Sequence, residues 1–450
     1  MERARAGRSG GLDRRDFLRM SGAGVVGLAA ADRMAALACG ESNVPPAAKP
    51  AKARTVIEIA LWGGMTQFET FDPKPKASFP GPFKPIDTNV PGIQVCELMP
   101  RLAKIADKYV ILRSMLNPRT GHGEAAYVMT ANAPYPADIT STHPSGKVVY
   151  PAVGAIIGMK KRLDGTYKGD IPPWVCVGNP PAPPYGVNEG FLGPKWKPLC
   201  TGERTGMKPD QVQQLNDRQA LLAVLEPAAA GAEKREAART ASALRQEVFR
   251  TMTSDAQKVF DLSEEPDTLK ERYGRDSFGK SCLLARRLAQ YGVPFISVAW
   301  GGDGKHGWDM HEQLGENCRA LVPTLDQTLS ALIEDLSQKG LLDSTIVVLF
   351  AENGKGPKLE GSSRGHWGRG FSVFLAGGGF KGGRTVGEMD DNGEFVKSRP
   401  IYPWDMWESI YLQMGIDPHD KFPNPYGCVV FVSQADAAGL PRGGVLKEIM

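Results

Sequence analysis

Hydrophobic residues recur at three- and four-residue steps between residues 321 and 336. This spacing predicts an amphipathic helix, and Lys339-Gly340 supplies the cation and glycine expected where such a helix ends. The β-branched run 346–350 follows and predicts a parallel strand buried on both faces. Because ligands bind beyond the carboxyl ends of strands in open α/β sheets, Glu352, just after this run, is the first candidate site residue.

Further apolar runs extend the same alternation along the chain. Strands are expected at 56–62, 109–113, 294–300 and 371–376, with helices at 98–107, 277–290 and 404–414 and a helix start after residue 124. The segment 172–198 is rich in Pro and Gly and is interpreted as long loops, and 209–265 as exposed helices over the sheet. The pattern predicts a three-layer α/β/α sandwich with a mostly parallel central sheet, in one domain over residues 55–450.

The N-terminus has the pattern of an export signal. Arg14 and Arg15 precede a weakly apolar segment rich in Gly and Ala, residues 21–31. This resembles the twin-arginine signal, so residues 1–40 are expected to be a signal peptide read by the twin-arginine export machinery, with a periplasmic or cell-envelope destination. Asp32 and Arg33 interrupt the apolar run, which argues against a membrane-spanning helix.

Two features follow the signal. Cys39 lies just after a small-residue cleavage pattern and is a candidate lipid anchor, although Ala36 matches the usual lipobox leucine poorly. Residues 41–54, rich in Pro, Ala and Lys, predict a flexible tether. Six cysteines remain beyond Cys39, and their spacing indicates neither a zinc site nor a disulfide pairing.

Charge excludes one class of partner. The net charge is +4, and the first 38 residues contribute +3 of it through seven Arg against four acids. The rest of the chain is close to neutral, which argues against nucleic acid as an electrostatic partner.

The densest group of potential metal ligands follows the predicted strand 294–300. Two acids and two histidines lie within nine residues there: Asp303, His306, Asp309 and His311. Asp and His together suit Zn, Mn or Fe better than Ca or Mg. Ca stays among the candidate cations, and a purely structural turn stays an alternative.

Other candidate residues lie in separate loops. Asp72 follows the first predicted strand and is either a metal ligand or the cap of a turn. His122 lies at a helix start, where free backbone N–H groups favour an anion. His366 is flanked by Arg364 and could bind a metal beside an anion that Arg364 or Lys355 neutralises, since Arg binds such groups bidentately.

One motif match is rejected on its context. Residues 274–281, GRDSFGKS, fit the phosphate-loop expression letter for letter. That motif requires a buried strand immediately before it, whereas 268–273 is charged and not strand-like. We expect Ser277 or its neighbours to start a helix instead.

The order of these motifs resembles the alkaline phosphatase and sulfatase superfamily. The resemblance rests on 98–115, which leads to a helix start, and on 325–354, a helix and a strand followed by polar residues. A closer resemblance is to the exported family DUF1501, which covers nearly the whole chain. It rests on the twin-arginine leader and on LWGG with FDPKP, HGEAAYVMT, RYGRDSFGKSCLLARRL, WGG with Asp-x-His, and HW before FSVFLAGGG.

The resemblance implies an alkaline phosphatase/sulfatase-like fold and a divalent cation (Zn, Mn, Fe or Ca). The residues that carry the match are Asp309, His311 and His366. Two departures are visible: Gly121-His122-Gly123 stands where those enzymes place a nucleophile, and Glu352-Asn353 stands where they have Asp-His.

Two functions are weighed. The first is a metal-dependent hydrolase of sulfate or phosphate esters, with an anionic ester or sulfated glycan as substrate. In it Asp72, Asp309, His311, Glu352 and His366 hold the metal, His122 is the general acid or base, and Lys355 and Arg364 neutralise the anion. The alternative is an inactive superfamily member that binds a glycan or an envelope protein, which the two departures favour.

Overall fold

The computed structural model describes residues 51–131, 150–178, 188–201, 255–422, 430–436 and 438–450. The predicted signal peptide, Cys39 and most of the tether lie outside these residues, as does most of the helical region expected at 209–265. The chain divides into two compact units, and the second covers Ala48–Met450. Among the described residues, no helix combines the length and apolar character needed to cross a membrane.

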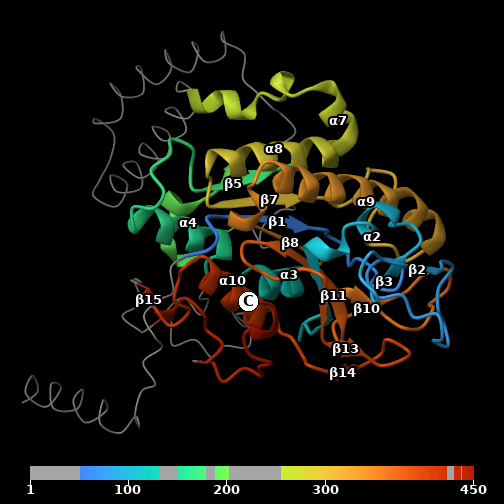
Figure 1. Ribbon diagram of the computed structural model, residues 1–450. Coiled ribbons are helices and arrows are strands. Elements are labelled where there is room, and N and C mark those ends of the chain that lie inside the picture. Colours follow the sequence, from blue (N-terminus) through green and yellow to red (C-terminus); the bar gives the residue numbers. More distant parts are fainter. Residues whose placement is uncertain (1–50, 132–149, 179–187, 202–254, 423–429, 437) are drawn as a thin grey trace, which may run out of the picture. The chain divides into compact units, whose positions relative to one another are not determined.

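An eight-stranded sheet forms the centre of the second unit, in the order β12-β4-β11-β8-β1-β7-β5-β6 (Figure 1). In that order the strands are Arg384–Val386, Tyr109–Met115, Phe371–Gly377, Thr345–Phe350, Thr55–Ala60, Phe295–Ala299, Trp174–Val177 and Leu199–Cys200. Only β11 pairs antiparallel with its neighbours; the other pairs are parallel. The predicted mostly parallel sheet is confirmed.

Helices cover both faces of this sheet. One face is covered by α2 (Pro100–Ala103), α7 (Asp267–Tyr273), α8 (Ser277–Tyr291) and α9 (Leu314–Gln338) (Figure 1). The other face is covered by α3 (His122–Ala131), α4 (Val153–Leu163) and α10 (Pro403–Gln413). The strand β1 shows why: Ile57 and Ile59 belong to the core beneath α8 and α9, whereas Val56 and Ala60 belong to the core beneath α4 and α10. Continuous apolar strands are therefore buried on both faces, and the three-layer sandwich is confirmed.

Four short two-stranded ribbons occur among the described residues outside the central sheet. Their strands are β2 (Pro85–Asp87) with β3 (Gln94–Cys96), β9 (Gly354–Lys355) with β10 (His366–Trp367), β13 (Glu388–Met389) with β14 (Val396–Ser398), and β15 (Lys421–Phe422) with β16 (Val430–Phe431). All four pairs are antiparallel. The ribbon β9–β10 matters most for function because it follows β8 and carries two candidate site residues.

Several sequence predictions need adjustment. The segment 172–198 was expected to be loop, yet Trp174–Val177 forms β5 inside the central sheet. The helix α9 begins at Leu314, earlier than its apolar repeat indicates, and ends with Lys339 and the left-handed Gly340 as expected. The tether prediction extends too far, because the amides of Lys52 and Ala53 both donate to Gln413 O.

The rejected phosphate-loop match starts a helix, as expected. Asp276 caps α8 by accepting a hydrogen bond from Gly279 N at 2.9 Å. The element before it is the helix α7, not a strand. An N-cap carboxylate at this position satisfies a free N–H of the first turn, so the motif has a structural explanation.

Candidate functional site

The candidate site lies at the carboxyl ends of the neighbouring strands β8, β1 and β7. Glu352 follows β8, Gly63 follows β1 and Asp309 belongs to the loop after β7. His122 enters from the first residue of α3. His366 comes from β10, directly paired with Lys355 of β9. Parallel strands end at one edge, which brings these separate segments together.

Three histidines surround the Asp309 carboxylate. Asp309 Oδ2 lies 3.2 Å from His122 Nε2, while Asp309 Oδ1 lies 3.0 Å from His311 Nε2 and 3.2 Å from His366 Nε2. His311 Nε2 and His366 Nε2 are themselves 3.1 Å apart. The rings of His122 and His311 each meet the His366 ring edge to face. The ligand atoms of His122, Asp309 and His366 all lie within 4.8 Å of one another, and His311 adjoins this group through Asp309 and His366.

Glu352 contacts the His122 ring at Nδ1, on the side away from Asp309. Its Oε1 lies 2.6 Å from His122 Nδ1, and both carboxylate oxygens accept from Gly63 N, at 2.9 and 3.1 Å. The Glu352 side chain is 1% exposed. A carboxylate on Nδ1 places the ring proton there and leaves Nε2 with a free lone pair. The same hydrogen bond, as the largest cause, raises the pKa of His122.

Gly63 is required by a close approach. Its φ of +125° is rare for residues with side chains, and a Cβ there would lie 2.1 Å from Asp309 N. The absence of a side chain therefore lets the loop that carries Asp309 pack against the end of β1 and lets Gly63 N reach Glu352. Sequence reasoning noted Gly63 only as the end of a strand, since no local pattern shows which distant backbone a glycine will meet.

Lys355 points its ammonium group at the same cluster. Its Nζ lies 3.9 Å from Asp309 Oδ1, is fully buried, and has no hydrogen-bond partner among the described residues. Burial lowers the pKa of Lys355. Its backbone is fixed on both sides by Gln67, whose side-chain oxygen accepts from Lys355 N and whose amide donates to Lys355 O. A buried ammonium group without a full partner costs free energy, which a bound anion would offset.

His366 is less basic than His122. Burial, and after it the charge of Lys355, lowers the pKa of His366 to about 4. Its ring is therefore neutral near pH 7, the form that can act as a metal ligand.

Asparagines join the start of α3 to the end of β8. Asn117 Nδ2 donates to Glu352 O at 3.0 Å, and Asn353 Nδ2 donates to Thr120 O at 2.8 Å. These bonds fix the approach of His122 to Glu352. Sequence reasoning missed this role of Asn117, and it noted Asn353 only as a departure from sulfatases.

Two predicted site residues have other partners. Asp72 forms ion pairs with Lys74 at 3.1 Å and Arg113 at 3.3 Å. Arg364 is fully buried and forms an ion pair with Glu69 at 3.2 Å. The structure therefore brings six of the eight predicted residues together, namely His122, Asp309, His311, Glu352, Lys355 and His366, and places these two in neighbouring ion pairs.

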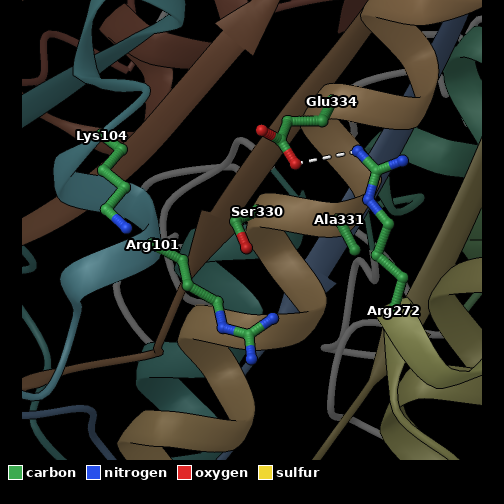
Figure 2. Close-up of a pocket in the computed structure, with 6 residues that line it drawn as sticks. All are labelled: Arg101, Lys104, Arg272, Ser330, Ala331 and Glu334. Atoms are coloured by element: carbon green, nitrogen blue, oxygen red, sulfur yellow. Dashed lines mark hydrogen bonds and ion pairs between the residues drawn. The ribbon is translucent and has the colours of Figure 1, made fainter.

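A cavity elsewhere in the fold has a different lining. It measures about 390 Å³ and lies among α2, α7 and α9, lined by Arg101, Lys104, Arg272, Ser330, Ala331 and Glu334 (Figure 2). Arg272 forms an ion pair with Glu334 at 2.8 Å. None of the predicted site residues lines this cavity. The cavity is therefore separate from the histidine cluster, which consists of His122, Asp309, His311 and His366.

Comparison with solved structures finds distant likenesses. The lipoteichoic acid synthase LtaP from Listeria monocytogenes is 12% identical, with 84% of this chain and 76% of that chain covered, at a TM-score of 0.39. A protein in the alkaline phosphatase superfamily from Vibrio parahaemolyticus is 12% identical, with 82% of this chain and 68% of that chain covered, at a TM-score of 0.39. The C-terminal periplasmic domain of EcEptC from Escherichia coli, in complex with Zn, is 10% identical. The match covers 88% of this chain and 99% of that chain, at a TM-score of 0.38. At these TM-scores the likenesses support no argument about chemistry.

Sequence comparison is more specific about the family. No curated protein matches the chain. The family described as "Protein of unknown function (DUF1501)" matches residues 53–437. This range begins just before β1 and includes His122, Asp309, His311 and His366. It also confirms the family expected from the sequence motifs: the chain belongs to the DUF1501 family.

Proposed function

We propose that this chain is a metal-dependent hydrolase of sulfate or phosphate esters. The observation that carries the proposal is the convergence of His122 Nε2, His311 Nε2, His366 Nε2 and the Asp309 carboxylate, with neighbouring donor atoms 3.0–3.2 Å apart. With metal–ligand bonds of about 2.0 Å, the ligands of a tetrahedral ion lie roughly 3.3 Å apart. The ligand atoms of His122, Asp309 and His366 all lie within 4.8 Å of one another, and His311 Nε2 lies beside Asp309 and His366, so small shifts would bring them to the spacing of a single ion.

The donor set favours a transition metal. Imidazole nitrogens with one carboxylate suit Zn, Mn or Fe, whereas Ca takes six to eight oxygen ligands. We assign His122, Asp309, His311 and His366 as the ligands and Glu352 as the residue that orients His122. In this assignment His122 is a ligand, in place of the acid–base role expected from the sequence, and Asp72 and Arg364 support the surrounding loops.

Lys355 is assigned to the substrate anion. Its buried ammonium group faces Asp309 and has no hydrogen-bond partner among the described residues. A sulfate or phosphate oxygen would satisfy it, and a fixed cation in a water-poor site stabilises the charge that develops during ester cleavage. A divalent ion in the site would polarise the ester oxygen and lower the pKa of a bound water.

A second candidate function is binding without hydrolysis, of a sulfated glycan or an envelope partner. One observation favours it: among the described residues, no Ser, Thr or Cys side chain is hydrogen-bonded to the cluster. Ser, Thr and Cys are common nucleophiles in enzymes that form a covalent intermediate. Without one of them, direct attack by water is the simplest route to hydrolysis, and an assay of turnover separates the two functions.

Elemental analysis of the protein, purified without chelator, tests the metal site. We expect one equivalent of Zn, Mn or Fe, with a large loss on Asp309→Ala combined with His311→Ala. His419→Ala is the matched control, because His419 lies near Asp417 and Asp436 and away from the cluster. Metal content that is the same in the double variant and the control would refute the assignment.

A screen of aryl sulfates, phosphate monoesters and phosphonate monoesters then separates hydrolysis from binding. Turnover by the metal-loaded protein, lost in the double variant, supports the hydrolase. The binding function would be supported instead if the protein binds metal but turns over no ester. In that case the wild type should also bind an immobilised sulfated glycan, and Lys355→Met should abolish that binding.

A further inference from the structure

The last two strands of the central sheet bring two cysteines together. Strands β5 and β6 are parallel, and Cys176 and Cys200 are direct partners in their register. The backbone fixes this register, because Thr201 N donates to Cys176 O at 3.0 Å. Residues that pair directly in neighbouring strands project their side chains from the same face of the sheet.

This spacing lies within the range of a disulfide. Adjacent strands are about 4.8 Å apart, and bridged cysteines have Cα atoms roughly 4.4–6.8 Å apart. Each thiol is the largest influence on the pKa of the other, which reflects their direct pairing in the sheet. A bond between them therefore requires side-chain rotation with little movement of the backbone.

The two thiols differ in access and in acidity. Cys200 is exposed and Cys176 is buried. Contact with the Cys176 thiol, with a smaller contribution from Lys197, lowers the pKa of Cys200 to about 7. A partly ionised, accessible thiol reacts with disulfides. The other described cysteines, Cys96, Cys282 and Cys318, are buried.

We propose that Cys176 and Cys200 form a disulfide that fastens the edge strand β6 to β5. The oxidant is a disulfide of the thiol-oxidoreductase or glutathione class. The Cys200 thiolate attacks it and releases one thiol; Cys176 Sγ, losing its proton, then attacks Cys200 Sγ in the mixed disulfide and releases the second thiol. The two thiols of the protein are oxidised and the oxidant is reduced to two thiols.

The bond constrains the edge of the sheet. Because β6 has only two residues, its backbone pairing alone holds it weakly. Closing a loop of roughly 25 residues with a disulfide is expected to raise the melting temperature by about 3–6 °C in a chain of this size.

The experiment uses the full chain, reduced and then treated with oxidised glutathione. Intact mass should fall by two hydrogens, and peptide mapping should link the segments that contain Cys176 and Cys200. Cys200→Ser, at an exposed position, should abolish the link and the gain in melting temperature. Cys282→Ala in α8 is the control and should retain both.

Three results would overturn the proposal. One is a glutathione adduct that persists on Cys200 without a link to Cys176. Another is two free thiols after oxidation in a protein that is shown to be folded. The third is a link from either residue to a different cysteine.

Discussion

Glu352 is buried, and both of its carboxylate oxygens already have hydrogen-bond donors. It lies directly after β8, where the sequence predicts a site residue, but its contacts are with His122 and Gly63. A carboxylate that holds the Nδ1 proton of a histidine fixes the tautomer in which Nε2 can bind a metal. Glu352 therefore contributes to the proposed metal binding by orienting His122, not as a ligand itself.

Glu352→Gln tests this positioning role. The amide NH₂ of Gln can donate to His122 Nδ1, which shifts the ring proton to Nε2 and removes its lone pair from the site. We expect a 10–100-fold loss of metal affinity, measured by competition with a chromophoric chelator. Glu97→Gln, at an exposed position beside Lys84, should leave the affinity unchanged. Unchanged affinity in Glu352→Gln itself would contradict the role.

Lys355 illustrates a conflict between stability and function. A buried ammonium group without a hydrogen-bond partner costs free energy, and burial lowers the pKa of Lys355. The charge is then less favourable in the folded chain than in the unfolded chain. A bound anion would offset this cost.

Lys355→Met should therefore raise the melting temperature while it lowers activity. We expect kcat/KM for an anionic ester to fall roughly 100-fold, because one fixed electrostatic contact is lost. Calorimetry and steady-state kinetics on the same preparations measure both effects. A melting temperature that falls, together with kinetics that do not change, would show that Lys355 serves the fold alone.

The sequence predicted most of these residues but not their partners. Asp309, His311 and Glu352 follow strand ends, and that position alone indicates a site. The pairing of His122 with Glu352 depends on a distance between segments far apart in the chain, which no local pattern contains. Asp72 resembles a ligand in sequence, yet Lys74 and Arg113 surround it in space.

At the scale of elements, the strand β1 combines apolar burial with one carboxyl group. Glu58 lies at its centre, accepts a hydrogen bond from Ser297 Oγ at 2.8 Å, and has its other oxygen unpaired among the described residues. Burial raises the pKa of Glu58 to about 7. The protonated form is thus favoured inside the sheet.

Glu58→Gln should change how stability depends on pH. The folded pKa of Glu58 lies above its unfolded value, so its stabilising effect is complete below pH 4.5 and is lost as pH rises through about 7. From pH 4.5 to pH 8 the wild type should lose roughly 3 kcal/mol of unfolding free energy relative to the variant. Urea unfolding at both pH values measures this difference. Parallel curves for the two proteins would show that Glu58 does not titrate in the folded state.

Elements were predictable where their pattern was long. The helix α9 and the strands β1 and β8 carry continuous or periodic apolar residues, so their type followed from sequence. The strand β5 was missed because four residues among prolines and glycines resemble a loop; it is a strand because β7 pairs with it in register. Tertiary pairing overrides weak local preference in such a segment.

At the scale of the whole molecule, the proposed destination is the periplasm or cell envelope. Arg14-Arg15 and the small-residue segment that follows resemble a signal that carries folded proteins. Replacing Arg14 and Arg15 together by Lys should abolish export, measured by fractionation of a bacterial host with a working twin-arginine system. Arg19→Lys should leave export intact. Export of the double variant would mean that another route is used.

The ligands of the proposed metal site come from His122, Asp309, His311 and His366, which lie on segments far apart in the chain. Such contacts form late, because distant segments must first meet and the entropy of closing long loops is lost before any contact compensates. A metal ion would therefore find its ligands only once the sheet is assembled, and it would stabilise that state alone. An occupied site would then mark a chain that has finished folding, a property that would suit the proposed export of the folded protein by the twin-arginine route.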